Sequence, residues 1–240
     1  MDRNIRMTVK LGNGLEFNGE SLYQPERYNR TFYPLVYAGV GPKPDAIFCG
    51  NGSLDGLDVK GKIVLCDRGG DIARTDKGVT VQSVGGVSLI LTNGPLDGYS
   101  TLADPHDHVL PASHIGYSDG VKIKSYISAS SNPTVSFIFE GTILGTSPAP
   151  AIASFSSGGP SLASPGILKP DITGPGVRVL AAWPFDVGPS TVNSTGPTFN
   201  IISGTSMSTY SSSQWHSGGA QGRTSGFIQD IVESMFYSGL

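Results

Sequence analysis

Short apolar runs bounded by glycine, proline or aspartate recur between residues 31 and 141 of the chain. Runs of this length and setting are typical of β-strands, and they predict strands at 33–37, 62–66, 87–92, 109–115 and 134–139. Two intervening segments, 72–84 and 119–129, space their apolar residues as an α-helix does, and Ser118 or Asp119 could cap the second. The pattern therefore predicts a compact α+β module over residues 31–141.

The segments on either side of this module follow different patterns. Met7–Leu11 predicts one short strand ahead of a turn at Gly12–Gly14, and a strand without partners is not stable alone. After the module, the apolar runs 152–155 and 177–182 have the near-continuous hydrophobicity of strands buried in a parallel sheet. From residue 210 onward Ser, Gly, Gln and Thr dominate, and this composition does not favour a buried helix.

One further apolar run leads to a serine with candidate chemistry. Phe199–Ile202 predicts a buried strand, Gly204 allows a tight turn, and Ser206 follows just ahead of an expected helix. A hydroxyl at a helix N-terminus lies beside unpaired N–H groups and the positive end of the helix dipole, which stabilise developing negative charge. The local pattern fits a nucleophile. It also fits an N-cap, which is the commoner role of serine before a helix.

Composition argues against several classes of function. A formal net charge of −3 with a pI near 5.7 gives no reason to expect nucleic acid or an anionic membrane as a partner. No apolar run has the length of a membrane span, and the charged segment Met1–Arg6 does not have the pattern of a secretion signal. The spacing within Asp104–His108 fits no zinc pattern, so we expect a solvated loop there, no metal and no cofactor.

The cysteines and the glycosylation sequons bear on the compartment. Cys49 and Cys66 could form a disulfide or remain two buried thiols. Asn-x-Ser/Thr sequons, the acceptor sequence for N-glycosylation, begin at Asn29, Asn51 and Asn193. Such sequons also arise by chance in a chain rich in Ser and Thr. Together with the cysteine pair they favour a secretory ancestry.

Ordered motifs along the chain resemble those of plant-type subtilases, the subtilisin-like serine peptidases of plants. Gly204-Thr-Ser-Met-Ser208 is similar to the nucleophile motif of that family. It is preceded, in family-like order, by Phe155-Ser-Ser-Gly-Gly-Pro160, Leu168-Lys-Pro-Asp-Ile172, Gly174-Pro-Gly176 and Val179-Leu-Ala-Ala182. A second set of motifs resembles the protease-associated (PA) domain of the same family, namely Gly61-Lys-Ile-Val-Leu-Cys-Asp-Arg-Gly69, Lys77-Gly78 and Gly85-Gly86. The resemblance runs from about Asp2 to Thr209.

The resemblance implies a fragment in which an α+β PA domain is inserted in an incomplete α/β subtilisin-like parallel-sheet core. It divides the chain into four segments. Residues 1–30 are an N-terminal piece of the core, and residues 31–141 are the PA domain. Residues 142–209 are the core segment with the nucleophile motif, and residues 210–240 are an aberrant or disordered tail. The tail departs from the family because Tyr210 and Ser211 stand where the family has a Pro-His pair. Gly158 likewise stands where the family commonly has arginine.

By the same resemblance, the function is serine-type endopeptidase activity on protein or peptide substrates, with Ser206 as the nucleophile and an extracellular location. The family's catalytic Asp and His, and the Asn of its oxyanion hole, precede the serine, and their motifs are not found in this sequence. His106, His108 and His114 lie in the PA module, and His216 lies in the tail. A serine without a base is a weak nucleophile at neutral pH. We therefore expect the chain to be inactive by itself.

Two alternatives remain open at the level of the sequence. The PA module could act as a non-catalytic domain that folds by itself and contacts other proteins. The chain could also be a truncated gene product without a role of its own. The first alternative requires that residues 31–141 fold cooperatively.

Overall fold

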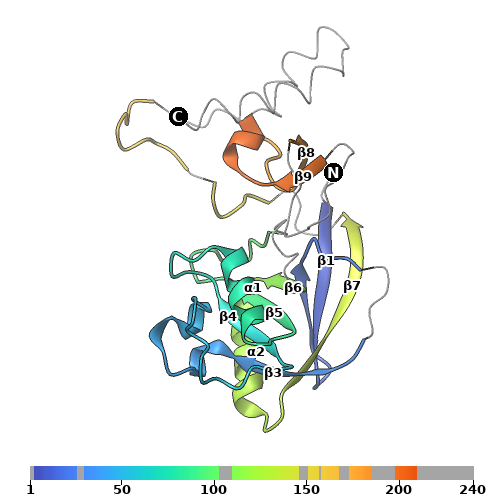
Figure 1. Ribbon diagram of the computed structural model, residues 1–240. Helices are drawn as coiled ribbons and strands as arrows, with labels where there is room; N and C mark the ends of the chain where they lie inside the picture. The colour runs from blue at the N-terminus through green and yellow to red at the C-terminus, as the bar shows by residue number, and fades with distance from the viewer. Residues whose placement is uncertain are drawn as a thin grey trace. The chain divides into compact units, whose positions relative to one another are not determined.

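The computed structural model describes residues 3–25, 30–102, 110–145, 151–156, 158–167, 173–184 and 198–209. The chain divides into two compact units, Met1–Ser154 and Phe155–Leu240, and each is described here by itself. The first unit contains the labelled elements from β1 to β7 and both labelled helices, and the second contains β8 and β9 (Figure 1).

The first unit is built on a closed β-barrel, whose strands follow one another in the order β1-β2-β6-β5-β4-β3-β7. The bounds are Arg3–Leu11 (β1), Glu16–Glu20 (β2), Tyr33–Tyr37 (β3), Ile63–Asp67 (β4), Ser88–Thr92 (β5), Ala112–Ile115 (β6) and Thr134–Leu144 (β7). Strands β3 to β6 pair in parallel, and the other neighbours are antiparallel. Parallel neighbours need a crossover connection, and α1 (Arg74–Ser83) supplies the one between β4 and β5.

The elements expected between residues 31 and 141 are present, with small shifts at their ends. The expected segments 72–84 and 119–129 correspond to α1 and to α2 (Tyr117–Ala129). The expected cap of α2 was wrong, because its N-cap is Gly116 and no side chain caps it. The helix begins at Tyr117, so that Ser118 and Asp119 lie inside its first turn.

Strand β1 closes the barrel by pairing on both of its edges. One edge pairs with β7 from Leu11 opposite Val135 to Arg3 opposite Leu144, with one irregularity in register after Arg6. The other edge pairs with β2. The sequence placed residues 1–30 in a segment separate from the 31–141 module, whereas the structure makes β1 and β2 strands of the same barrel. The lone strand expected from the sequence therefore has partners on both sides.

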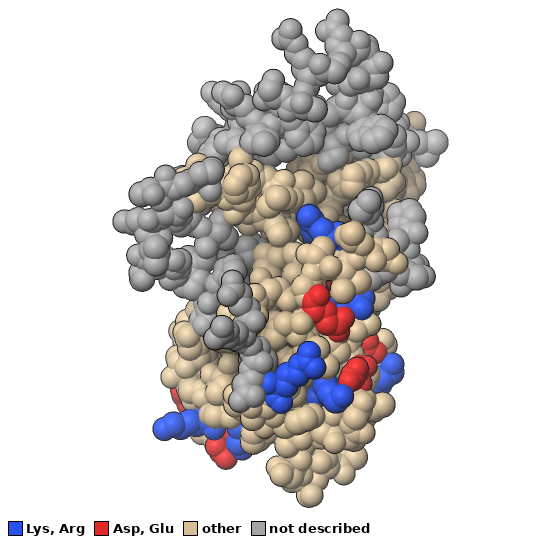
Figure 2. Space-filling view, turned by 90° about the vertical axis from the view of Figure 1, so that its right-hand side faces the viewer, with Lys and Arg blue, Asp and Glu red and all other residues tan. Residues whose placement is uncertain are grey.

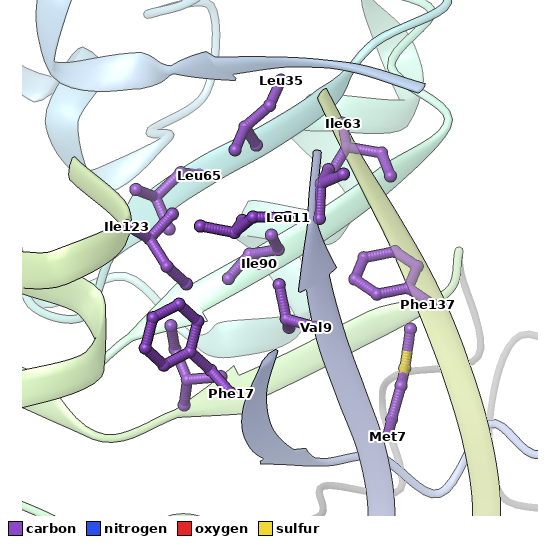
Figure 3. Close-up of a cluster of buried hydrophobic side chains, with 12 residues drawn as sticks. Met7, Val9, Leu11, Phe17, Leu35, Ile63, Leu65, Ile90, Ile123 and Phe137 are labelled. Atoms are coloured by element: carbon purple, nitrogen blue, oxygen red, sulfur yellow. The ribbon is translucent and has the colours of Figure 1, made fainter. Parts of the chain in front are cut away.

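A cluster of buried side chains joins all these strands to α2 (Figure 3). Met7, Val9 and Leu11 alternate along β1, so their side chains point to the same face, and none of the three has exposed surface. Phe137 on the neighbouring β7 is buried as completely. Burying an apolar side chain of this size contributes about 1.5–3 kcal/mol. The rest of the cluster is Phe17, Leu35, Ile63, Leu65, Ile90, Ile115, Ile123 and Val135.

A second buried cluster occupies the opposite face of the parallel strands. Along β4, Ile63 and Leu65 belong to the first cluster, and Val64 and Cys66 belong to the second. Strands covered on both faces read as continuous apolar runs, which is why the sequence located β4 so clearly. The elements that cover this face of the parallel strands include α1 and two 3-10 helices, η1 (Ala38–Val40) and η2 (Pro44–Phe48).

A disulfide links the segment that contains η2 covalently to β4. Cys49, directly after η2, is bonded to Cys66 across a Cα–Cα distance of 5.8 Å. Both cysteines are fully buried. Closing a loop of this size contributes about 3 kcal/mol in the chain-entropy model.

In the second unit, β8 (Val179–Trp183) and β9 (Thr198–Ile202) form a two-stranded antiparallel sheet. The sequence correctly located both strands, but it wrongly predicted that both are buried and that the first belongs to a parallel sheet. Leu180 is 55% exposed and Phe199 is 52% exposed. Their apolar runs are therefore covered only in part by the described residues.

The expected strand at 152–155 was also wrong. Residues 151–156 form no strand, and their polar backbone groups bond to the loop after β5 instead. The Tyr99 hydroxyl donates to the Ile152 carbonyl oxygen at 3.1 Å, and the Ser154 N–H donates to the Ser100 hydroxyl at 3.3 Å.

We predict that Gly120→Ala destabilises the first unit although alanine is the better helix former. A Cβ at residue 120 would overlap the Thr92 hydroxyl and would lie 2.7 Å from the Thr92 Cβ. Overpacking of this kind costs about 1–3 kcal/mol, which exceeds the gain of about 1 kcal/mol in helix propensity. Urea unfolding followed by circular dichroism would measure the change.

The matched control for Gly120→Ala is the double variant with Thr92→Ala. Thr92→Ala removes the hydroxyl that the new methyl group would overlap but keeps the Thr92 Cβ 2.7 Å away, so the double variant should recover only part of the lost stability. Equal stability of Gly120→Ala and the unaltered chain would contradict the packing argument.

Candidate functional site

Ser206 lies in the first turn of a helix that directly follows β9. The chain leaves β9 through Ser203 and Gly204 and becomes helical at Thr205, and the Ser206 side chain is exposed. The Ser203 hydroxyl accepts a hydrogen bond from the N–H of Arg178, at 2.9 Å. The strand, turn and helix expected around Ser206 are therefore present.

A glycine-rich loop ahead of β8 packs against this turn. The Gly204 N–H donates to the Gly176 carbonyl oxygen at 2.8 Å. The Ser208 hydroxyl donates to the Gly174 carbonyl oxygen at 2.8 Å and accepts from the Gly174 N–H at 3.2 Å. A Cβ on Gly176 would lie 2.7 Å from the Gly204 carbonyl oxygen. The two backbones can approach this closely because residue 176 has no side chain.

The described residues of the second unit include no histidine, aspartate or glutamate that could activate Ser206. No hydrogen bond joins the Ser206 hydroxyl to a histidine or a carboxylate in this part of the chain. Asp171 and the histidines 106, 108 and 216 lie outside the described residues. The remaining histidine, His114, is buried in the first unit.

His114 has a structural place in β6. Its Nε2 lies 2.7 Å from the Asn93 amide oxygen, which only accepts, so Nε2 carries the proton. Its Nδ1 then accepts from the Leu102 N–H at 3.0 Å. Both ring nitrogens are engaged, and the imidazole holds the loop after β5 against β6.

Charged groups gather where the parallel strands β3 and β4 end. At the end of β4, one oxygen of Asp67 accepts from the Lys124 ammonium at 2.6 Å and from the Tyr37 hydroxyl at 3.1 Å. Lys124 also lies over the Tyr37 ring, 4.7 Å from its centroid. Neighbouring Arg68 forms an ion pair with Asp97 at 2.7 Å. Asp67 and Arg68 are therefore both in partly buried ion pairs.

A buried lysine connects three segments beside this group. Lys77 on α1 has no exposed surface, and its ammonium donates to the Phe48 carbonyl oxygen at 2.7 Å and to the Gly69 carbonyl oxygen at 2.9 Å. One feature of the sequence could have indicated this burial, because Lys77 lies four residues before the apolar Val81 and so on the same helix face. A lysine at that position is normally expected to reach solvent.

Burial shifts the pKa values of these groups in different directions. Burial lowers the pKa of Lys77 to about 8, and the charge of Asp67 opposes this in part. Burial also acts to lower the pKa of Lys124, but the hydrogen bond and charge of Asp67 outweigh it, so that this pKa is raised. The pKa of Tyr37 is raised, first by burial and then by the charge of Asp67.

The described residues hold neither a metal-binding cluster nor a membrane span. No group of His, Cys, Asp or Glu among them could hold a metal ion. No helix among them is long and apolar enough to cross a bilayer. Figure 2 shows acidic and basic side chains interspersed on one face, without a broad patch of one sign.

Comparisons with known proteins show which proteins this chain resembles. A family model described as the PA domain matches residues 31–123. The subtilisin-like proteases SBT1.5, SBT1.6 and SBT1.7 of Arabidopsis thaliana are 48%, 45% and 43% identical to the chain over 86%, 86% and 87% of its length. The chain is therefore similar to the plant subtilisin-like proteases, and its residues 31–123 match the PA domain. It spans 28%, 27% and 28% of the length of these three relatives.

Among solved structures, the aminopeptidase from Aneurinibacillus sp. strain AM-1 is 22% identical with a TM-score of 0.43, covering 59% of this chain and 32% of that chain. The PA-domain match begins just before β3 and ends within α2. Strands β1, β2 and β7 lie outside the match, yet they complete the barrel around it.

We predict that the free energy of unfolding of the PA domain rises with pH between about pH 8 and 10. The pKa of Lys77 is about 8 in the folded chain and about 10.4 when unfolded. The unfolded state therefore binds more protons in this range, and stability rises with pH wherever that is so. Above pH 10 the raised pKa values of Tyr37 and Lys124 act in the opposite direction. Urea unfolding at several pH values would measure the slope.

The control for this slope is Lys77→Met, which removes the titrating group. At pH 7 the variant should be less stable by about 1–3 kcal/mol for each carbonyl left unpaired. The difference in stability between it and the unaltered chain should grow from pH 8 to 10. A constant difference across that range would contradict the assignment.

Proposed function

We propose that residues 142–209 are the nucleophile-bearing part of a subtilisin-like serine endopeptidase, with Ser206 as the attacking residue. The observation that carries the proposal is the exposed Ser206 on a strand–turn–helix segment held by the Gly174–Gly176 loop. Support comes from the identity of 48% to SBT1.5, a subtilisin-like protease, over 86% of the chain. The fold in which the PA domain is inserted in a subtilisin-like core is part of this proposal.

The proposed chemistry is acyl transfer from a protein substrate. The Ser206 Oγ attacks the carbonyl carbon of the scissile peptide while its proton passes to a general base, and the peptide amine leaves with a proton. Water then hydrolyses the acyl-enzyme and restores the hydroxyl. The base and its supporting carboxylate must come from polypeptide beyond the described residues of this chain. Because the sequence motifs that carry this base and carboxylate in the resembling family are not found in this chain, we propose that the chain alone is inactive.

A second candidate function rests on the closed barrel. Residues 3–145 contain two buried clusters and a disulfide, and the barrel pairs the edges of its strands with one another. These features support a PA domain that folds by itself and contacts proteins without catalysis. Limited proteolysis that leaves a stable fragment near these limits would favour it, and uniform digestion would count against it.

We predict that a fluorophosphonate serine-hydrolase probe does not label the folded chain of 240 residues. A hydroxyl without a base reacts slowly at neutral pH. Ser206→Ala is the control for specificity. Labelling that is present in the chain and lost in Ser206→Ala would overturn the proposed inactivity.

The role of Ser206 itself is tested in a chimera. Residues 151–209 of this chain would replace the aligned segment of SBT1.5, and cleavage of a protein substrate would be measured. We expect an active chimera in which Ser206→Ala loses at least about a thousand-fold in kcat, since the nucleophile is the largest single requirement of this chemistry. Thr209→Ala, which removes an exposed hydroxyl that donates to the Thr205 carbonyl oxygen of the same helix, is the matched control. Undiminished activity of the Ser206→Ala chimera would exclude Ser206 as the nucleophile.

A further inference from the structure

One buried hydroxyl in the PA domain makes no hydrogen bond that would explain its presence in the fold. Ser53, in the turn after η2, is only 3% exposed, and its Oγ has no hydrogen-bond partner among the described residues. Its backbone N–H donates to the Gly50 carbonyl oxygen at 2.9 Å, a bond that any residue except proline could make. A buried hydroxyl without a partner lowers stability relative to an alanine of similar shape. The folded barrel therefore gives no account of the serine at this position.

The residue two positions before Ser53 is exposed. Asn51 lies at the surface, in a turn where Gly52 has a φ of 67°. The turn is held from the side by Lys43, whose ammonium donates to the Gly52 carbonyl oxygen at 2.6 Å and pairs with Asp55 at 3.0 Å. None of these bonds uses the Asn51 side chain. A large group on the Asn51 amide can project into solvent without disturbing the turn.

We propose that Asn51 carries an N-linked glycan and that Ser53 is present as part of its acceptor sequence. Asn51-Gly-Ser53 is an Asn-x-Ser sequon, and the hydroxyl at its third position is what the acceptor sequence requires. In the reaction, the amide nitrogen of Asn51 forms a bond to the anomeric carbon of a lipid-linked oligosaccharide. The bond from that carbon to the lipid pyrophosphate breaks, the pyrophosphate leaves, and the amide proton passes to a base of the transferase.

The burial of Ser53 determines when the transfer occurs. In the folded domain the hydroxyl is enclosed, so an enzyme that must engage it can do so only before the segment from η2 to β4 has folded. The same segment contains Cys49, which bonds to Cys66, and disulfides form and persist in oxidising compartments. The glycan is therefore added in the secretory pathway, before this loop closes. Asn29 and Asn193 lie outside the described residues and carry no part of this argument.

The first test measures glycan occupancy at Asn51. The full chain would be secreted from a eukaryotic cell line behind a cleavable signal, and its glycans removed by peptide-N-glycosidase F in ¹⁸O water. Mass spectrometry of the peptide containing residue 51 should show conversion of asparagine to ¹⁸O-labelled aspartate. Ser53→Ala should abolish this conversion, and Ser53→Thr should preserve it. An unmodified Asn51 in the secreted wild-type chain would overturn the proposal.

The second test asks whether Ser53 has a structural role instead. The chain and Ser53→Ala would both be refolded from bacteria, without glycans, and their melting temperatures compared. We expect the melting temperature of Ser53→Ala to be equal or higher, since the variant removes an unpaired buried hydroxyl. A lower melting temperature would show that the hydroxyl supports the fold and would overturn the structural argument for the sequon.

Discussion

The pairing of β1 with β7 is the interaction on which the first unit depends. It joins residues 3–11 to residues 135–144, across most of the length of the PA-domain unit. Without it, the edges of β7 and β2 would present unpaired backbone groups. Met7 and Val9 would also lose the face that buries them beside Phe137. The barrel is thus closed by residues that are distant in sequence, and its core is complete only when they meet.

Polar interactions and a disulfide add to the apolar packing on the opposite side of the parallel strands. Short 3-10 helices and loops cannot satisfy all their backbone carbonyls internally. Lys77 does this for Phe48 and Gly69, at the cost of burying an ammonium group, and its lowered pKa expresses that cost. The disulfide between Cys49 and Cys66 restrains the same loops covalently. Hydrogen bonding and a covalent bond thus restrain this region together with its apolar packing.

The segment that carries Ser206 is organised by backbone contacts. The close approach of Gly176 to Gly204 and the paired bonds of Ser208 to Gly174 fix the turn before the helix. The accompanying sheet has only two strands, and it leaves apolar side chains such as Leu180 exposed. Two-stranded sheets are marginal by themselves. The segment therefore needs further polypeptide to cover its exposed apolar side chains, in addition to the base that the proposed nucleophile requires.

Local sequence patterns were sufficient to predict the elements between residues 31 and 141 and the strand, turn and helix around Ser206. These follow from local apolar periodicity and from glycine positions, which act over a few residues. Only the tertiary structure decided that β1 and β2 belong to the PA-domain barrel, that β8 and β9 are antiparallel, and that residues 152–155 form no strand. It also decided the partners of Asp67 and Lys77. Strand partners and buried charges depend on contacts between distant residues, and no local pattern encodes them.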